Sequence, residues 1–189
     1  MRLTPLPAPP PSAPRLEYAR EPDVSEQLDR ELRALISSCF NGPEDAFLRD
    51  QRWVREMPLH RYMLRDESGQ LVAHAAVHEK SIGVGAGELL VGGMAEVCVL
   101  ESQRGRGYVR RLLEAAHGGM LERGIHFALL WGDRQVYRSS GYRAVEAPIR
   151  RLNHKTQTIE VGTMDTVLYK PLTEQPWPEG LVDLRGPLF

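Results

Sequence analysis

Residues 97–116 read VCVLESQRGRGYVRRLLEAA and combine three structural signals in one stretch. A short apolar strand leads into a turn with two glycines, and the turn leads into a segment with the apolar spacing of a helix. The first amides of a helix lack intrahelical acceptors and lie at the positive end of its dipole. Because glycine permits φ > 0 and close approach of a ligand, the turn Gln103–Tyr108 predicts an anion site, such as one for a pyrophosphate, to which Arg104 and Arg106 add charge.

The turn does not match the two best-known phosphate-binding patterns. It is not GxxxxGK[ST], and GxGxxG fails because Arg110 stands where the third glycine belongs. Taken alone, the feature is equally compatible with a glycine-rich turn that binds nothing.

Outward from this stretch, the pattern predicts a mixed α/β sheet flanked by helices. The expected helices, besides the one after Gly107, are Asp23 to about Phe40, Glu44–Glu56 and Arg134–Ser139. The expected strands are two joined at Asp66–Gln70, one over residues 87–100, and His126–Trp131, Tyr142–Val145 and Asp165–Tyr169. Gly92-Gly93 inside a strand indicates a bulge or a close approach to the backbone.

Length and composition are those of one soluble α/β domain. The chain has 189 residues, 24 Lys+Arg against 25 Asp+Glu and a formal charge of −1, so a basic nucleic-acid footprint is disfavoured. No apolar run reaches the roughly 20 residues of a membrane span. The two cysteines lack metal-ligand spacing, which indicates no metal and favours the reducing cytoplasm. We expect a Pro-rich disordered tail over residues 1–15, the domain over 16–172, and an irregular C-terminal tail over 173–189 that packs on it.

The central stretch resembles the acetyl-CoA motif of the GNAT N-acetyltransferases, [RQ]-x-x-G-x-[GA] after a strand that ends in valine. Arg104, Gly107 and Val109 occupy the three marked positions, with Val109 where the pattern has Gly or Ala. Residues 129–145, LLWGDRQVYRSSGYRAV, resemble the later segment of the family, with Tyr137 and Gly141-Tyr142 in the expected places. The resemblance covers roughly residues 24–170. The end of the chain, WPEGLVDLRGPLF, is more weakly similar to nodulation N-acyltransferases and aminoglycoside 2'-N-acetyltransferases.

The resemblance implies a single-domain GNAT acyl-CoA N-acyltransferase fold whose mixed central sheet is splayed at the cofactor site. It implies acetyl-CoA as co-substrate, with pantetheine paired to Val97-Cys98-Val99 and a main-chain N–H near Val99 polarising the thioester carbonyl. The cofactor-binding residues would be Val97, Cys98, Val99, Arg104, Gly105, Arg106, Gly107, Tyr108 and Val109.

The resemblance also implies a candidate general acid for the transfer reaction. The pattern of residues indicates a candidate general base. Tyr137 would protonate the leaving CoA thiolate; otherwise it is a buried core tyrosine. Glu96, a carboxylate in an apolar strand, would accept the amine proton; otherwise it pairs with an arginine. His74 and His78 are read as satisfied strand histidines, either of which could contact the acceptor. Cys98 has no adjacent basic group, which disfavours an acyl-cysteine and favours direct attack in a ternary complex.

We therefore expect an acetyl-CoA-dependent N-acetyltransferase that acts on the primary amine of a small molecule. The acceptor would be walled by the first two helices, the 125–142 region and the C-terminal tail, with Trp53, Tyr62, Trp131 and Trp177 as lining or core residues. A longer acyl donor and an acyl-CoA-binding module without turnover are the alternatives. The family resemblance also allows a homodimer.

Overall fold

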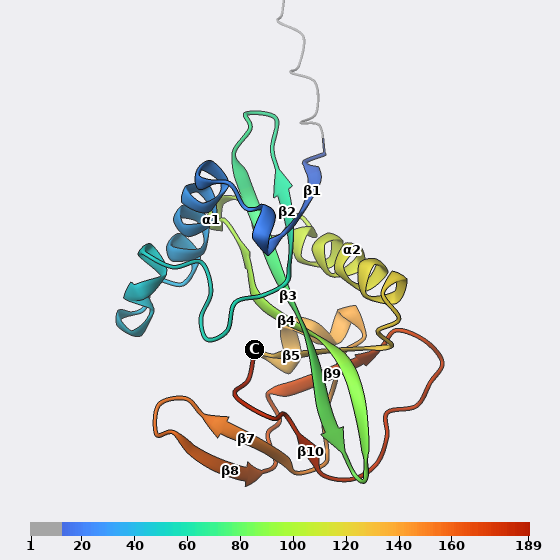
Figure 1. Ribbon diagram of the computed structural model, residues 1–189. Helices are drawn as coiled ribbons and strands as arrows, with labels where there is room; N and C mark the ends of the chain where they lie inside the picture. Colours follow the sequence, from blue (N-terminus) through green and yellow to red (C-terminus); the bar gives the residue numbers. More distant parts are fainter. Residues whose placement is uncertain (1–12) are drawn as a thin grey trace, which may run out of the picture.

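The computed structural model describes residues 13–189, which form ten strands of one mixed sheet with helices on both of its faces (Figure 1). The predicted Pro-rich tail lies outside the described residues except at its end, where β1 begins at Arg15. The strands are β1 Arg15–Arg20, β2 His60–Arg65, β3 Leu71–Val84, β4 Gly87–Val99, β5 Phe127–Trp131, β6 Arg143–Ala144, β7 Ile149–Asn153, β8 Thr158–Gly162, β9 Val167–Pro171 and β10 Val182–Asp183. The α-helices are α1 Glu26–Cys39, α2 Tyr108–Glu122 and α3 Arg134–Tyr137, and the 3-10 segments are η1 Glu21–Asp23, η2 Pro43–Arg49, η3 Glu101–Gln103 and η4 Arg138–Ser140.

Helices α1 and α2 cover opposite faces of the central strands (Figure 1). Helix α1 buries Leu32, Leu35 and Ile36 against Met63, while α2 buries its apolar stripe against the other faces of β2 and β3. The N-cap of α1 is Ser25, whose hydroxyl accepts from the N–H of Leu28. The predicted start at Asp23 was therefore early, because that residue ends the separate segment η1.

The strand order is β6-β9-β5-β4-β3-β10-β7-β8, and β2 pairs with the first half of β3 and with β1. The predicted turn at Asp66–Gln70 is confirmed, with Gly69 at φ +86. The predicted neighbours β4 and β5 are parallel and joined by α2, which covers one face of the sheet. Pairing between them covers only Gly92–Met94 of β4, and beyond Met94 the two strands separate.

The structure differs from the expected elements at three places. The helix predicted over Glu44–Glu56 is the short segment η2, because the chain after Arg49 turns back to place Arg52 on Glu21 and the Val54 amide on Glu96. The β7–β8 hairpin was not predicted. Thr158–Gly162 alternates polar and apolar residues, but Ile159 and Val161 are exposed, and Ile149–Asn153 shows no such alternation. The C-terminal tail, expected to be irregular, contributes β10 between β3 and β7.

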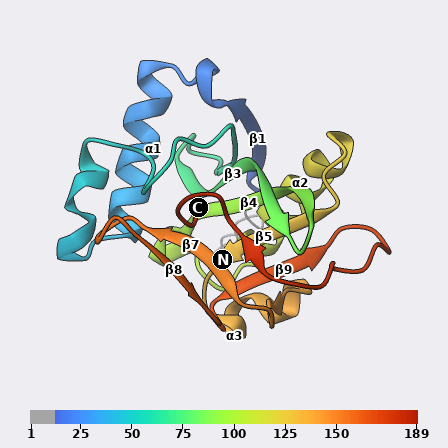
Figure 2. The ribbon, with the colours of Figure 1, turned by 60° about the horizontal axis from the view of Figure 1, so that its bottom comes forward.

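The C-terminal segment packs Leu184, Leu188 and Phe189 on the face of the central strands opposite α2, and the β7–β8 hairpin extends the sheet beyond β10 (Figure 2). The tip of the hairpin comes close to η2 in both ribbon views. The ring of Phe189 packs directly on the backbone of β4 at Gly93. A Cβ at position 93 would lie 2.2 Å from that ring, so a glycine is required for this contact. A Cβ at Gly92 would likewise collide with Met120. The glycine pair therefore marks close packing on both faces, and the bulge lies farther along β4.

Candidate active site

The turn before α2 has the geometry of an anion cradle. Gly105 and Gly107 take φ of +76 and +77, and a Cβ at either position would meet no atom within 4 Å. Gly107 caps the helix without a side chain, and the first helical bond runs from the Arg111 N–H to the Gly107 carbonyl. The N–H groups of the first turn therefore point outward without helical partners, which suits a diphosphate.

A groove of about 440 Å³ runs from this turn along the open edge of β4. The residues predicted to bind the cofactor line it with one exception: Val97, Cys98, Val99, Arg104, Gly105, Gly107, Tyr108 and Val109. Arg106 instead lines a neighbouring depression with Arg110 and Arg111.

The Val99 N–H lies on the open edge of β4 and has no partner strand there within the described part of the chain. Because the Leu100 N–H donates to Val72 of β3, strand alternation turns the Val99 N–H to the opposite edge, where β5 has separated. The Val99 carbonyl on this edge accepts from the Cys39 thiol and the Arg104 guanidinium, at 3.5 and 3.4 Å.

Cys39 is a member of this groove that the sequence analysis missed. It comes from the end of α1 and contacts Cys98, although 58 positions separate the two residues in the sequence. A hydrogen bond with Cys98, assisted by Ser38 and the charge of Arg104, lowers the pKa of Cys39 to about 6. The same bond and burial raise the pKa of Cys98. The more acidic thiol is thus the one on the helix.

Tyr137 lies between this groove and a second cavity and lines both. Its ring packs edge-on against Tyr142 and fits beside Gly132, where a Cβ would come within 2.7 Å. Tyr142 is held in turn by His117 at 2.8 Å. Burial raises the pKa of Tyr137, and its hydroxyl forms no hydrogen bond with residues 13–189. The phenol therefore keeps its proton and has it available to donate.

Glu96 sits on a bulge in β4, with φ of +44 and two β4 residues facing Ala75. One carboxylate oxygen accepts from the Val54 N–H at 3.0 Å, and Oε2 is buried with no partner among the described residues. Burial raises the pKa of Glu96 to about 7, against the opposing effects of the Val54 bond and Arg61. Such a carboxyl exchanges a proton near neutral pH.

The two strand histidines lie outside both cavities. His74 is fully buried and bridges the Glu96 carbonyl at 3.0 Å and the Arg61 guanidinium at 3.1 Å. Burial and the Arg61 charge lower its pKa to about 3, so it stays neutral and holds the bulge in place. His78 packs against Phe189.

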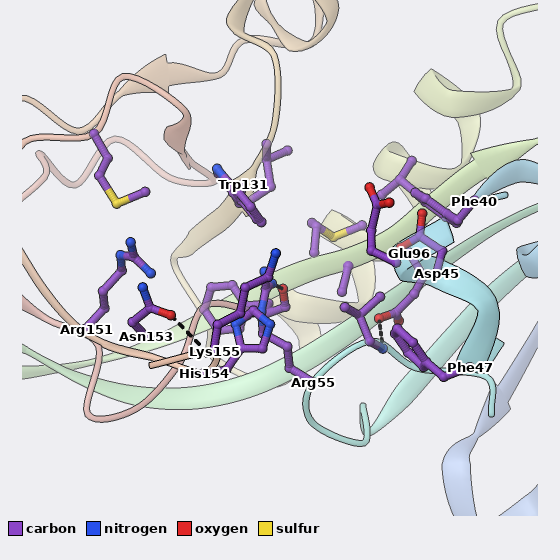
Figure 3. Close-up of a pocket in the computed structure, with 18 of the residues that line it drawn as sticks. Phe40, Asp45, Phe47, Arg55, Glu96, Trp131, Arg151, Asn153, His154 and Lys155 are labelled. Atoms are coloured by element: carbon purple, nitrogen blue, oxygen red, sulfur yellow. Dashed lines mark hydrogen bonds between the residues drawn. The ribbon is translucent and has the colours of Figure 1, made fainter. Parts of the chain in front are cut away.

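The second cavity has a volume of about 650 Å³, in the usual range for a small-molecule site. It lies between η2, the ends of β4 and β5 and the β7–β8 tip, and Figure 3 shows ten labelled residues around it. It shares Phe40, Val97 and Tyr137 with the first groove, so the two spaces meet there.

Of the four aromatic residues suggested as its walls, only Trp131 lines this cavity. Tyr62 packs under α2, Trp177 packs against Phe127, and Trp53 stacks with Arg52. The tail contributes Phe189, and the hairpin tip contributes walls that sequence reasoning missed.

Within residues 13–189, no three His, Cys, Asp or Glu side chains gather as metal ligands would. No helix in this part of the chain has the length and apolar character needed to cross a membrane.

Comparisons with known proteins agree with this geometry. A family model described as the GNAT acetyltransferase domain matches residues 23–145. The GNAT family N-acetyltransferase YhbS from Escherichia coli, solved in complex with CoA, superimposes with a TM-score of 0.68 at 19% identity, covering 95% of this chain and 93% of that one. A GNAT acetyltransferase from Brucella melitensis, in complex with acetyl-CoA, gives 0.56 at 18% identity, covering 89% and 94%.

A probable N-acyltransferase from Enterococcus faecalis gives a TM-score of 0.57 at 15% identity and covers 70% of this chain and 33% of that one. At these identities the structural matches show the fold. No curated protein matches the sequence. Since the family model spans well over half of the 189 residues, the chain belongs to the GNAT acetyltransferase family.

Proposed function

We propose that the protein is an acetyl-CoA-dependent N-acetyltransferase that acetylates a primary amine of a small molecule by direct attack in a ternary complex. One observation carries the proposal: the groove below α2 and the second cavity meet at Val97 and Tyr137, next to the unpartnered Oε2 of Glu96. A donor in one space and an acceptor in the other would meet at a proton acceptor and a proton donor.

The donor side follows from the main chain. The amides that open α2 would hold the diphosphate, with Arg104 nearby and Arg106 reaching from the adjacent depression. The backbone of Val97–Val99 would pair with the pantetheine amides, and the Val99 N–H would polarise the thioester carbonyl. Complexes of the E. coli and Brucella proteins with CoA and acetyl-CoA support this donor.

The chemistry needs three proton movements. Glu96 first takes a proton from the ammonium, which frees the lone pair of the amine for attack. Attack forms the C–N bond of the amide and breaks the C–S bond of the thioester, and Tyr137 gives its proton to the departing thiolate. The Tyr137 phenolate then takes the second proton from nitrogen as the amide forms, and Glu96 releases its proton to bulk water, so both groups are restored and no redox partner is required.

Thiol release tests the proposal most simply. Purified protein is incubated with acetyl-CoA and a panel of aminoglycosides, polyamines, amino acids and peptide N-termini, and the released thiol and the N-acetyl product are both quantified. We expect one class of amine to give equal amounts of thiol and amide. CoA binding without amide from any amine would refute turnover, and a preference for longer acyl-CoA donors would replace the acetyl assignment.

The compartment and assembly remain proposals of the same kind. Both cysteines are free thiols, which supports a reducing cytoplasm. A homodimer is proposed on family resemblance alone, and size-exclusion chromatography with light scattering measures it directly.

A further inference from the structure

The second cavity carries opposite charges at its two ends. Glu44 and Asp45 of η2 and Glu96 of β4 line the end that faces the donor groove. Figure 3 shows Asp45 and Glu96 together beside Phe40 at one side of the cavity. The buried Oε2 of Glu96 has no partner among the described residues and is the polar atom best placed to receive an ammonium.

The opposite end is basic. Arg151 from β7 and Lys155 from the hairpin tip lie across the cavity from Glu96, and Arg55 approaches them from the segment after η2 (Figure 3). The Arg55 Nε is 3.2 Å from His154, and burial together with the charges of Arg55, Lys155 and Arg151 lowers the pKa of that histidine. Four basic groups therefore share one small region.

Their charge is only partly neutralised by the residues that the structure describes. Arg151 pairs with Glu160, Arg55 donates to the Phe189 backbone and stacks on Trp131, and Lys155 forms no ion pair within residues 13–189. Asn153, which lines the same end, also binds Glu160 and fixes the hairpin tip. The Arg151 and Arg55 guanidinium groups are therefore held at the cavity wall, and the exposed Lys155 ammonium can add a further contact to an anion bound there.

We propose that the acceptor is an amine that also carries an anionic group, a carboxylate or a phosphate. This inference rests on the proposed function and narrows its acceptor. The amine lies at the Glu96 end, next to Val97 and Tyr137, and the anion lies against Arg151 and Lys155. The apolar walls between the two ends, including Met94, Leu130 and Trp131, accommodate the body of the molecule.

The two charged ends also give an orientation. An acceptor bound in reverse would place its anion beside the three carboxyl groups and its ammonium beside the basic side chains. Repulsion between like charges would disfavour this orientation at both ends. The anion thus serves to present the amine to the donor groove, and an amine without it loses this constraint.

Matched acceptors test the proposal. We would measure kcat/KM for pentylamine against 6-aminohexanoate, phenethylamine against 4-(2-aminoethyl)benzoate, and tyramine against tyramine O-phosphate, with acetyl-CoA in excess, because each anionic member carries its anion at the end of the molecule opposite the amine. A charge-assisted hydrogen bond corresponds to roughly tenfold or more in binding. We expect the anionic member to be preferred by about tenfold or more in at least one pair, and the pairs distinguish carboxylate from phosphate.

Two variants localise the preference. Arg151→Gln and Lys155→Gln should each reduce the ratio of kcat/KM between the anionic and neutral members towards one. The matched control is Arg30→Gln, which removes a cation from the exposed face of α1 and should preserve the ratio. Lys155 is exposed at a hairpin tip, so its replacement leaves folding intact, as circular dichroism would verify.

Each outcome has a distinct meaning. Acetylation of neutral and anionic members at equal rates overturns the inference and leaves the proposed N-acetyltransferase activity in place. The same conclusion follows if the ratio of kcat/KM between anionic and neutral members is the wild-type ratio in Arg151→Gln, Lys155→Gln and Arg30→Gln alike. If no amine in either series is acetylated, the proposed function fails, and the acceptor class fails with it.

Discussion

At the residue scale, Glu96 shows which properties of a side chain can be predicted from the sequence and which depend on the folded structure. The sequence shows a carboxylate in an apolar strand, which is enough to predict a raised pKa. It does not show the bulge that turns the side chain towards the second cavity, because the bulge depends on how β3 and β4 pair. The contact with the Val54 amide was also hidden, since it requires the correct path of residues 50–59.

We predict that Glu96→Gln removes a pH-dependent limb of the reaction. With the pKa of Glu96 near 7, the wild-type kcat/KM should rise as pH increases through 7, because the base becomes ionised. The amide cannot titrate, so the variant should be slower by roughly 10²-fold or more and lack this limb. Profiles from pH 5.5 to 8.5 check this, and an unchanged profile removes Glu96 as the base.

Stability gives a control that is independent of catalysis. The pKa of Glu96 is higher in the folded protein than in the unfolded chain. The free energy of unfolding therefore falls as pH rises from about 4.5 to about 7, by roughly 3 kcal/mol. Urea unfolding at pH 5 and pH 8 should therefore show a smaller loss for Glu96→Gln than for the wild type.

Tyr137→Phe should lower turnover and leave donor affinity nearly unchanged. The ring keeps its packing on Tyr142, and only the proton donor for the thiolate is lost. We expect kcat to fall by roughly 10²-fold and the dissociation constant of CoA, measured by calorimetry, to stay within twofold. A variant with the wild-type rate would exclude Tyr137 as the acid.

Cys39 provides the sharpest test of direct attack. Its lowered pKa makes it the one thiol of the groove that could form an acyl-enzyme. Direct transfer predicts that Cys39→Ser keeps turnover within a few-fold. Intact-protein mass spectrometry of the wild type with acetyl-CoA alone should show no acetyl adduct. An adduct on Cys39 combined with an inactive serine variant would establish a two-step route instead.

At the element scale, local signals predicted most of the helices and strands of the central sheet, and elements stabilised by distant contacts were missed. The apolar spacing of α2 and the turn at Asp66–Gln70 specify their own structures. The β7–β8 hairpin and β10 have few buried residues and depend on their neighbours for pairing. The missed hairpin carries the basic end of the second cavity, so this part of the site could not be predicted.

The contact between β4 and the C-terminal segment predicts a specific coupling. Gly93→Ala places a methyl group where the Phe189 ring lies, so the ring must move away from the wall of the second cavity. We expect a loss of roughly 1–3 kcal/mol in the free energy of unfolding, as for other overpacked sites. A double-mutant cycle by urea denaturation should show that Phe189→Ala removes most of the cost of Gly93→Ala. Additive effects would contradict the contact.

At the scale of the whole molecule, the fold forms two spaces that meet at Phe40, Val97 and Tyr137, one proposed for the donor and the other for the acceptor. The groove is built from α2, the edge of β4 and the end of α1, while the second cavity is built from η2, the hairpin tip and the C-terminal segment. Most of the first set lies within residues 97–116, the motif stretch that the sequence makes recognisable, and Cys39 and Phe40 come from the end of α1. The second set comes from segments far apart in the chain, which explains why the residues around the second cavity were harder to predict than those of the groove.

The central claim is that main-chain amides at the start of α2 bind the diphosphate of an acyl-CoA. The most direct measurement is calorimetric titration of CoA into the wild type, Gly107→Glu and Gly69→Glu. Both glycines have positive φ and open space around them, so the two variants share the same backbone penalty and added charge, and only Gly107 faces the groove. We predict that the wild type and Gly69→Glu bind CoA with similar affinity and that Gly107→Glu loses binding by repulsion of the diphosphate. Equal affinity in all three proteins, or no binding by the wild type, would contradict the account.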